Sequence, residues 1–293
     1  MLIARPESIQ EVLVSAVRAL GVRTDYRTAR LEAELLLAHA LGLSRAGLLA
    51  RLADPLDAEA TARFGAMVAR REQGEPIAYI LGHKGFYGLD LIVDRRVLIP
   101  RPETELLVEL ALSALKQVAH PAPVVADIGT GSGAIVLAMA SQASSTRFIA
   151  TDISPEALQV AQLNARRLNL LDRVEFFAGD LLEPVNEPVD MITANLPYIP
   201  LLRYDQLPRE IRRFEPRVAL AGGLEGLSVI RRLLEQVEAH ATRAAIIFLE
   251  ISEEQGKAAR QLAESFFPKA IIQLHRDLEG LDRVVEIQLA GAV

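Results

Sequence analysis

The sequence predicts an α/β protein in which a small N-terminal helical bundle precedes a mostly parallel sheet. Residues 1–76 carry apolar residues at helical spacing almost throughout, which indicates helices. Beyond residue 123, short apolar runs alternate with helical stretches, which is typical of a parallel sheet with crossover helices. The last two apolar runs are separated only by the short loop LEGLD, so the sheet is expected to end with an antiparallel strand.

The helical bundle is expected to fill residues 1–76. Its first helix has an apolar face from Ile9 to Leu20, with Ser8 as its cap and Gly21 as its stop signal. Further helices are expected at residues 29–42, around 44–52, and at 57–73, where Gly74 and Pro76 follow. Arginines and acidic residues balance in this segment, so the acidic excess of the chain lies downstream.

Residues 77–100 are expected to form a hairpin-like connector between the bundle and a second domain, residues 101–293. The stretch YILGHKGFYGLDLIVDRRVLIP has little helical periodicity and is rich in glycine, aromatic and β-branched residues. A helix is expected next, in PRPETELLVELALSAL. Pro102 lies near its first turn, and Glu103 and Glu105 suit a helix N-terminus because of the helix dipole.

The second domain is expected to alternate strand and helix along most of its length. Parallel strands are predicted at residues 124–129, 147–153, 174–180, 189–196 and 244–251, and the closing pair at 270–277 and 283–290. In an open parallel sheet, ligands bind in the crevice outside the carboxyl ends of the strands. Polar residues that follow these strands are therefore the candidates for a binding site.

Composition and charge exclude several kinds of function. The chain has no cysteine, which excludes disulfides, thiolate metal sites and thiol catalysis, and its histidines show no metal-ligand spacing, so no metal is expected. The N-terminus does not resemble a signal peptide, and no apolar run approaches the ~20 residues that span a bilayer. We therefore expect a soluble cytoplasmic protein without a membrane partner. The net charge of −6 argues against a protein whose main role is to bind the phosphate backbone of a nucleic acid.

The stretch VVADIGTGSGAIVLAMA is predicted to be a strand, a glycine-rich turn and a helix. Gly129, Gly131 and Gly133 leave room for a ligand against the backbone, and the helix N-terminus supplies unpaired N–H groups. With Ala134 and the later Asp152, the loop also fits the G-x-G-x-x-G/A dinucleotide pattern. By itself this loop leaves nicotinamide and flavin cofactors open.

Three acidic residues at strand ends favour another cofactor. Asp127, two residues before the first glycine, would oppose a pyrophosphate but suits a cation. S-adenosylmethionine presents an ammonium, a sulfonium and a ribose diol, and it has no phosphate. Asp127 would face its methionine end, directly or through water, while Asp152 would accept from the ribose hydroxyls and Asp180 from the adenine amino group. A single strand-end Asp is often only a cap, but three beside a glycine loop predict an S-adenosylmethionine site.

The stretch DMITANLPYIP places an amide at the mouth of a predicted strand. A planar NH₂ group is a poor nucleophile, and two acceptors aimed at its hydrogens would turn its lone pair toward a methyl group. The side-chain oxygen of Asn195 and the carbonyl of Leu196 can be these acceptors. Pro197 restricts the preceding residue, and Tyr198 offers a face for stacking. Catalysis would be positioning for in-line displacement; the alternative is a plain strand-exit turn.

The chain resembles a known family of enzymes. Asn-Leu-Pro-Tyr is similar to the (Asn/Asp)-Pro-Pro-(Tyr/Phe) motif of amino-methylating S-adenosylmethionine enzymes. The whole chain resembles the HemK/PrmC family of peptide chain release factor glutamine methyltransferases. The matching stretches, which cover most of residues 74–285, are GEPIAYILGHKGFYGLDLIV, VLIPRPETELLVE, DIGTGSGAIVLAMA, the TDIS…NA run, NLPYIP, FEPRVALAGGLEGL and DLEGLDR.

The resemblance implies a Rossmann-like class I S-adenosylmethionine methyltransferase sheet for the second domain. It implies N5-methylation of the glutamine in the Gly-Gly-Gln motif of release factors, with residues 1–76 helping to dock the release factor. Together with the argument from the residues, the predicted cofactor-binding set is Asp127, Gly129, Thr130, Gly131, Ser132, Gly133, Asp152, Asp180, Leu181 and Asn195. The predicted catalytic and substrate-binding set is Asn195, Leu196, Pro197 and Tyr198.

The sequence departs from the family pattern at two of these positions. Leu196 stands where the first proline of the motif is usual; that residue is thought to act through its carbonyl, which leucine also has, so activity should survive with less rigidity. Leu181 follows Asp180 where some relatives carry an aromatic residue, which puts adenine stacking there in doubt. The PRPETE segment, Pro100 to Glu105, is either a closing segment over the site or a simple linker. Glu215, Pro216 and Glu250 are expected to be structural.

Three other interpretations stay open at the level of the sequence. A nucleic-acid amino methyltransferase would use the same Asn-x-Pro-Tyr device and often flips its target base. Against it stand the acidic balance and the lack of a lysine-rich region, so nucleic acid is not the expected substrate. In its favour is a cluster of Arg203, Arg209, Arg212, Arg213 and Arg217. A non-catalytic binding module and a nicotinamide oxidoreductase are weaker alternatives.

Overall fold

The computed structural model describes residues 7–239 and 246–289, which divide into two compact units. The first unit comprises the described residues up to Gly82 together with Arg209–Phe214, and the second comprises His83–Pro208 and the described residues from Glu215 onward. The expected strand residues 244, 245 and 290 lie outside the described residues. Within the described ranges, no helix is both long and apolar enough to cross a membrane.

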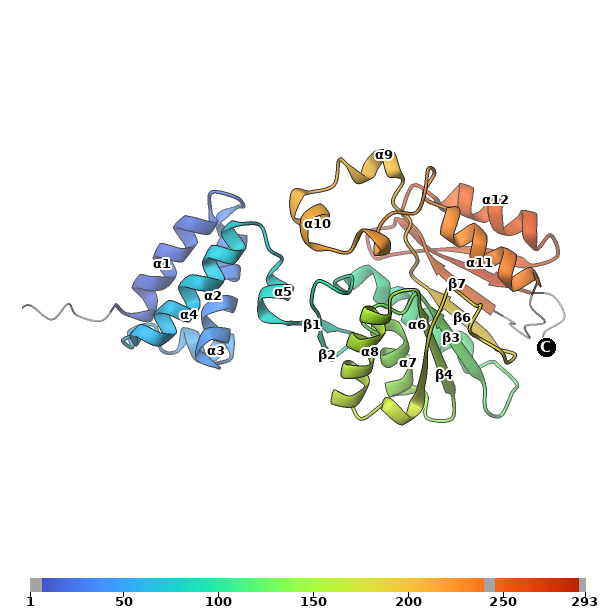
Figure 1. Ribbon diagram of the computed structural model, residues 1–293, viewed down its shortest axis with the longest axis horizontal. Helices are drawn as coiled ribbons and strands as arrows, with labels where there is room; N and C mark the ends of the chain where they lie inside the picture. The colour runs from blue at the N-terminus through green and yellow to red at the C-terminus, as the bar shows by residue number, and fades with distance from the viewer. Residues whose placement is uncertain (1–6, 240–245, 290–293) are drawn as a thin grey trace, which may run out of the picture. The chain divides into compact units, whose positions relative to one another are not determined.

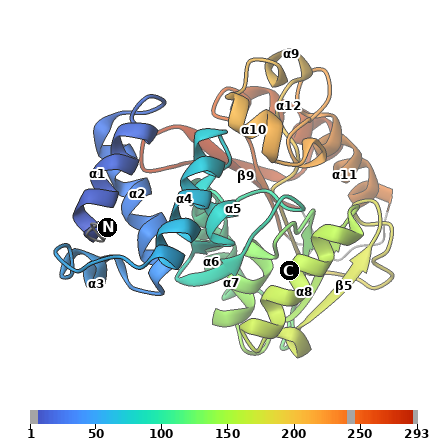
Figure 2. The same ribbon diagram turned by 60° about the vertical axis from the view of Figure 1, so that its left-hand side comes forward.

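The first unit is helical, and its helices α1 to α4 form a bundle (Figures 1 and 2). Its helices are α1 Ile9–Leu20, α2 Tyr26–Leu41, α3 Arg45–Leu49, α4 Ala58–Glu72, α5 Ile77–Leu81 and α10 Arg209–Phe214. The Ser8 side chain accepts from the backbone N–H of Glu11, and the Glu11 carboxylate accepts in return from the backbone N–H of Ser8. This capping box confirms the predicted start of the first helix.

The bundle has its own hydrophobic core, formed by the apolar faces of its long helices. Leu36 and Leu37 of α2 are fully buried in it. Arg71 of α4 pairs at 2.7 Å with Glu32 of α2 and at 2.9 Å with Glu210 of α10. The short helix α10, which lies far along the chain, therefore belongs to the helical unit through an ion-pair network.

The segment after residue 76 differs from the hairpin-like expectation at its start. Residues Ile77–Leu81 form the short helix α5, whose first turn is closed by Tyr79 and Ile80 donating to the carbonyl of Pro76. Five residues are too few to show helical periodicity, which explains why the sequence pattern missed this helix. The expected hairpin follows as β1 His83–Phe86 and β2 Leu89–Ile92, joined by Tyr87 and Gly88 with positive φ angles as in a type I′ turn.

The second unit is built on a seven-stranded sheet. Its strands are β3 Val124–Ile128, β4 Arg147–Asp152, β5 Val174–Ala178, β6 Met191–Ala194, β7 Ile246–Glu250, β8 Ile271–Arg276 and β9 Asp282–Gln288, in the order β5-β4-β3-β6-β7-β9-β8. Strand β9 is antiparallel to both of its neighbours, β7 and β8. The predicted mostly parallel sheet with an antiparallel last strand is thus confirmed, with β9 lying inside the sheet.

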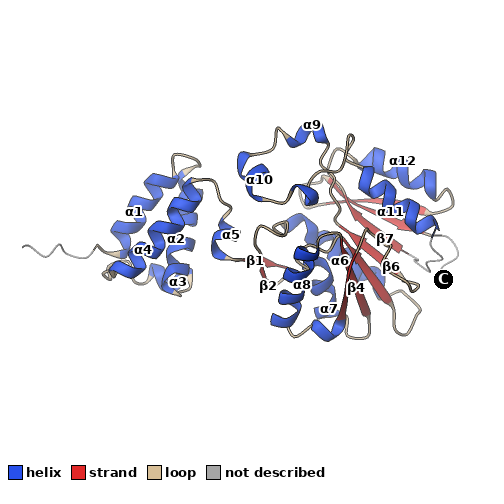
Figure 3. Ribbon diagram, in the orientation of Figure 1, coloured by secondary structure: helices blue, strands red, loops and turns tan. Residues whose placement is uncertain are grey.

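Helices cover both faces of the sheet, as Figures 1 and 3 show. The helices α6 Glu105–Leu115, α7 Ala134–Gln142 and α8 Pro155–Arg167 pack on one face, and α11 Ser228–Ala239 and α12 Gly256–Phe266 on the other. Side chains of β3 alternate between the two cores, with Val124 and Ala126 in one and Val125 in the other. The central strands β3 and β6 are buried at every position, as expected for parallel strands that are covered on both faces.

The strand order reverses at β3. From β3 the chain moves to β4 and β5 on one side, and then returns to β6 and β7 on the other. Ligands of open α/β sheets bind at such a switch point, outside the carboxyl ends of the strands. The remaining short elements lie in the connections: α9 Leu201–Tyr204 and the 3₁₀ helices Pro102–Thr104, Leu171–Arg173 and Arg217–Ala219.

Candidate active site

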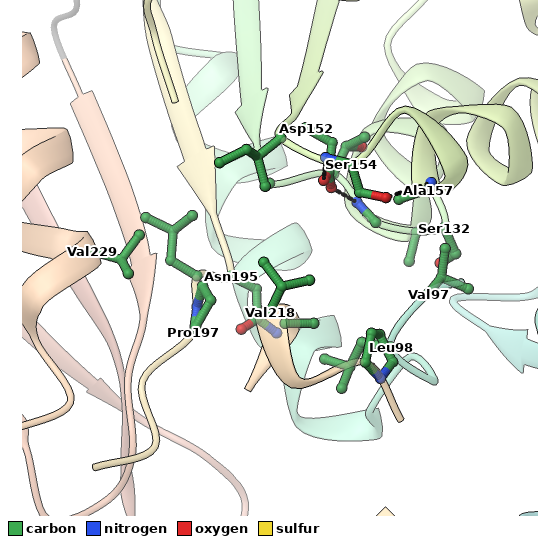
Figure 4. Close-up of a pocket in the computed structure, with 18 of the residues that line it drawn as sticks. Val97, Leu98, Ser132, Asp152, Ser154, Ala157, Asn195, Pro197, Val218 and Val229 are labelled. Atoms are coloured by element: carbon green, nitrogen blue, oxygen red, sulfur yellow. Dashed lines mark hydrogen bonds between the residues drawn. The ribbon is translucent and has the colours of Figure 1, made fainter. Parts of the chain in front are cut away.

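A cavity of about 250 Å³ lies at this switch point, and the residues that line it all belong to the second unit. Figure 4 shows side chains from several segments gathered around it. Most of the predicted site residues line it, namely Gly129, Thr130, Gly131, Ser132, Asp152, Asp180, Leu181, Asn195, Leu196 and Pro197. Three predicted residues are not among its lining: Asp127, Gly133 and Tyr198.

The glycine loop after β3 has a backbone that favours glycine at each predicted position. Gly129, Gly131 and Gly133 have φ angles of 73°, 56° and 81°, in the left-handed region that side chains disfavour. A Cβ on Gly129 would also lie 2.9 Å from Cδ2 of Leu196, whereas one on Gly131 would meet no atom within 4 Å. The loop is therefore packed against the strand-exit turn at Gly129 and faces open space at Gly131.

Asp127 lies buried beneath this loop. Its carboxylate accepts from the hydroxyls of Thr130 at 2.7 Å and Thr193 at 2.9 Å, and from the backbone N–H of Val136 in α7. Burial raises the pKa of Asp127 to about 6, and the nearby charge of Asp152 adds to the rise. The carboxylate holds the turn between strand and helix together. Its predicted contact with a cationic ligand, directly or through water, stays a prediction.

Asp152 lies at the end of β4 and lines the cavity. One carboxylate oxygen accepts from the backbone N–H of Gly131 at 2.8 Å, and the other from that of Ser154 at 2.9 Å. Burial raises the pKa of Asp152, while these backbone donors act in the opposite direction. A carboxylate has about four acceptor positions, so Asp152 can still accept from a ligand hydroxyl while its orientation is fixed.

Asp180 and Leu181 follow β5 and border the same cavity. The Asp180 carboxylate forms an ion pair with Arg232 of α11. Leu181 has a φ angle of 55°, which is uncommon for a residue with a side chain. Its carbonyl accepts from the Thr151 hydroxyl at 2.8 Å, which holds this backbone in place. The sequence did not reveal the pairing with Arg232. The predicted contact of Asp180 with an adenine amino group stays a prediction.

Asn195 follows β6, and its side-chain amide nitrogen donates to the hydroxyl of Thr104 at 3.1 Å. This bond uses the amide NH₂ and leaves the side-chain oxygen for another partner. Leu196 is 3 % exposed and packs against Gly129, and Pro197 lines the cavity beside it. The Asn195 amide therefore lies in the same cavity as the glycine loop, with its oxygen free of the bond to Thr104.

Tyr198 is the predicted site residue whose surroundings differ most from the expectation. Its hydroxyl lies 3.4 Å from the carboxylate of Glu250, and its backbone carbonyl accepts from Gln255 at 2.9 Å. Burial raises the pKa of this phenol, and the charge of Glu250 adds to the rise. The predicted stacking of a planar substrate on Tyr198 stays a prediction.

Several lining residues lie outside the predicted site set. The PRPETE segment, for which closure over the site was one of two alternatives, supplies Pro100, Arg101 and Thr104 to the cavity. Arg101 pairs at 2.6 Å with the buried Glu215, which joins this segment to the FEP stretch. Apolar lining comes from Val97, Leu98, Ile153, Val218 and Val229, of which Ile153 and Val218 are more than half exposed. Exposure of an apolar side chain at a cavity cannot be read from a sequence, so no pattern signalled these residues.

The arginine cluster after the motif is largely engaged within the chain. Arg203 pairs with Glu254 at 2.5 Å, and Arg217 lies over the ring of Tyr204 at 5.1 Å. Arg213 lies over the ring of Phe214 at 5.2 Å. The three arginines that line the cavity are also paired with carboxylates, namely Arg96 with Asp94, Arg101 with Glu215 and Arg232 with Asp180.

Comparison with known proteins gives consistent results along the chain. Residues 11–82 match the PrmC N-terminal domain, and residues 125–215 match a methyltransferase domain. A release factor glutamine methyltransferase of Moorella thermoacetica is 42% identical over 277 residues, which cover 94% of this chain and 96% of that protein. One of Rhodopirellula baltica is 38% identical over 287 residues, covering 94% and 97%.

Solved structures share the fold at much lower identity. The catalytic domain of hMettl16 in complex with the MAT2A 3′UTR hairpin 6 aligns with a TM-score of 0.56 at 14% identity, covering 80% of this chain and 83% of that one. A methyltransferase from Pyrococcus furiosus aligns with a TM-score of 0.50 at 19% identity, covering 76% and 96%. At these identities the likeness concerns the fold.

Proposed function

Because the chain belongs to the family of release factor glutamine methyltransferases, we infer that it is an S-adenosylmethionine-dependent protein methyltransferase. It transfers a methyl group to the N5 side-chain amide of the glutamine in the Gly-Gly-Gln motif of peptide chain release factors. At the site, the position of the Asn195 side chain carries this conclusion. Its amide stands beside the glycine loop, with its NH₂ bound to Thr104 and its oxygen left to accept.

The lining of the cavity suits a cofactor that has a cationic sulfonium and no phosphate. Its three arginines are each paired with a carboxylate of the chain, so they offer little to a pyrophosphate. The residues that would hold S-adenosylmethionine are those of the loop Gly129–Gly133, with Asp152 for hydroxyls and Leu181 for the apolar base. When bound, the cofactor supplies an electrophilic methyl group on sulfur.

The acceptor glutamine would be held by the strand-exit turn. The side-chain oxygen of Asn195 and the carbonyl of Leu196 would accept the two hydrogens of the substrate amide. Pro197 restricts the backbone of Leu196, so the second acceptor is aimed before the substrate arrives. Preorganised acceptors of this kind stabilise the charge that develops on nitrogen. No strong base is required in advance, since the amide nitrogen becomes acidic only as the methyl arrives.

The helical unit is the proposed docking surface for the release factor. In support, this unit has its own hydrophobic core and matches the PrmC N-terminal domain. We do not expect nucleic acid as a direct substrate, because the chain is acidic and the arginines Arg203, Arg213 and Arg217 already have partners within the chain. Because the proposed substrate acts in translation, we propose a cytoplasmic location.

A methyl-transfer assay with labelled S-adenosylmethionine tests this function. The substrates are a purified release factor and the same factor with its Gly-Gly-Gln glutamine changed to Ala; the enzymes are wild type and Asn195→Ala. We expect label only on the unaltered factor with wild-type enzyme, and a rate for Asn195→Ala lower by a factor on the order of 10²–10³, as for other lost preorganised contacts. The exposed Asn186 provides a matched control, and Asn186→Ala should match wild type. Label in RNA and not in the factor would overturn the assignment.

A further inference from the structure

A buried carboxyl group lies beside the acceptor amide, and nothing in the reaction as described so far uses it. Strands β6 and β7 are parallel neighbours, with Ala194 paired to Leu249. The next residues, Asn195 and Glu250, therefore leave the two strands at the same level and project on the same side of the sheet. Glu250 is 1 % exposed.

The contacts of Glu250 are few for a buried acid. One oxygen, Oε1, lies 3.4 Å from the hydroxyl of Tyr198, and the nearby Thr104 side chain lowers the pKa of the carboxyl group. The other oxygen, Oε2, is buried and has no hydrogen-bond partner among the described residues. Buried polar atoms are nearly always paired, so a buried carboxyl group with an open position calls for an explanation.

Thr104 joins this carboxyl group to the acceptor amide. It lies directly before α6, which packs against β6 and β7, so its hydroxyl reaches both strand ends. The hydroxyl accepts from the side-chain NH₂ of Asn195 at 3.1 Å, and its own hydrogen can point to Glu250, whose pKa Thr104 lowers. A hydroxyl has a single hydrogen. While that hydrogen points to Glu250, Thr104 can only accept from Asn195, and the amide oxygen of Asn195 must face the other way.

We propose that Glu250 is a positioning residue for methyl transfer: through Thr104 it fixes the Asn195 amide with its oxygen toward the substrate. This inference rests on the proposed function, since it assigns a role within the same site. Glu250 touches neither substrate nor cofactor in this scheme. Its ionised carboxylate sets the direction of a hydrogen-bond chain that runs through Thr104 to Asn195.

The direction of this chain depends on the charge of Glu250. Burial raises the pKa of Glu250 to about 7; Thr104, Arg283 and Tyr198 act to lower it, and the charge of Glu103 acts to raise it. A protonated carboxyl group becomes a donor. The protonated Glu250 can then donate to the Thr104 hydroxyl, and the hydrogen of Thr104 turns toward Asn195. To accept this hydrogen, the Asn195 amide rotates, so that its oxygen faces Thr104 and its NH₂ faces the substrate. Since a substrate NH₂ also donates, that state is inactive, and kcat should rise with pH through about 7.

The test compares pH profiles of kcat for wild type, Glu250→Gln and Thr104→Val with a release factor as substrate. Glutamine cannot ionise but keeps an acceptor oxygen for Thr104. The fall of kcat on the acidic side of pH 7, which we call the acidic limb of the profile, should therefore disappear in Glu250→Gln. Thr104→Val breaks the chain and should lower kcat by about tenfold, the scale of one misdirected hydrogen bond. Thr104→Ser restores the hydroxyl and should recover most of this loss. KM for S-adenosylmethionine should change little in each variant.

A matched control uses a second buried acid of the same sheet. Glu286 on β9 pairs with His275 at 2.6 Å, away from the cavity lining, and Glu286→Gln should keep the wild-type acidic limb. If the limb persists in Glu250→Gln, or if Thr104→Val and Thr104→Ser lower kcat equally, the positioning role is wrong. Failure of the proposed function looks different, because wild-type enzyme would then transfer no methyl group to the release factor at any pH.

Discussion

At the scale of single residues, Asp127 is the clearest case of a side chain whose environment changes its chemistry. The sequence suggested an acid facing a cationic ligand, but the structure surrounds its carboxylate with Thr130, Thr193 and the backbone of α7. Full burial disfavours the charged form, so a group that would be fully ionised in water is partly protonated near pH 6.

This shift makes a prediction about stability. The folded-state pKa of about 6 lies above the unfolded value of ~3.9, so the folded protein binds the proton more tightly. The contribution of Asp127 is therefore fully present below pH ~4 and is lost as pH rises through 6, by roughly 3 kcal/mol in the unfolding free energy. Urea unfolding of wild type and Asp127→Asn between pH 4.5 and 7.5 should show the wild-type advantage declining with pH.

Asp277 gives the control of opposite sign for that experiment. A hydrogen bond from the backbone N–H of Leu281 lowers the pKa of the Asp277 carboxylate, so its contribution is present above the unfolded pKa and is lost as pH falls. The difference between wild type and Asp277→Asn should therefore stay constant between pH 4.5 and 7.5, and should shrink only as pH falls below the unfolded value of ~3.9. A parallel trend for the two variants would contradict the burial argument for Asp127.

At the scale of elements, α10 shows how a short helix far along the chain joins the first unit. Its residue Glu210 is held by Arg71 of α4, which also binds Glu32 of α2. The side chains of Arg71 and Glu32 are only 13% and 12% exposed. At this burial, removing one partner leaves an uncompensated charge, which is the costly way to break an ion pair.

Arg71→Met should therefore lower the unfolding free energy of the helical unit by ~3–5 kcal/mol. Arg63 lies on the same helix and pairs with Glu59, but both side chains are exposed. Arg63→Met should change the unfolding free energy by ~1 kcal/mol or less, as exposed pairs do. Denaturant unfolding followed by circular dichroism measures both, and equal losses in the two variants would rule out a special role for the buried network.

At the scale of the whole molecule, the chain separates a helical unit from a unit that contains the cavity. A ligand that binds only the folded state stabilises the part of the protein that holds it. S-adenosylmethionine should therefore act on the second unit, with a gain of ~2.7 kcal/mol at one hundred times its dissociation constant.

Hydrogen exchange with and without S-adenosylmethionine resolves this effect along the chain. Amides of β3, β4 and β6, and of the loop Gly129–Gly133, should exchange more slowly with the cofactor present. Amides of α1 and α2 should exchange at the same rate. Slower exchange throughout the helical unit would mean that the two units unfold together, and unchanged exchange in the sheet would count against cofactor binding in the cavity.

Much of the fold could be predicted because it rests on local patterns. Alternating apolar runs and helical stretches placed the strands, and the capping box at Ser8 marked the first helix. The helix α5 was missed because its five residues are too short for periodicity. The sequence placed the glycine loop, Asp152 and Asn195 at one edge of the sheet, since each follows a strand and the carboxyl ends of parallel strands meet there; their roles stay predictions.

The sequence by itself determined the order of the strands along the chain, the antiparallel last strand, the glycine loop and the strand-exit turn at Asn195, because these depend on short-range spacing and backbone preference. Only the tertiary structure decided which side chains form hydrogen bonds or ion pairs with neighbouring residues. It turned Asp127 beneath the loop, paired Asp180 with Arg232, directed Tyr198 toward Glu250 and brought Thr104 to Asn195 across ninety-one positions of sequence. Such contacts are set by the register of neighbouring strands and by the packing of α6, which no local pattern encodes.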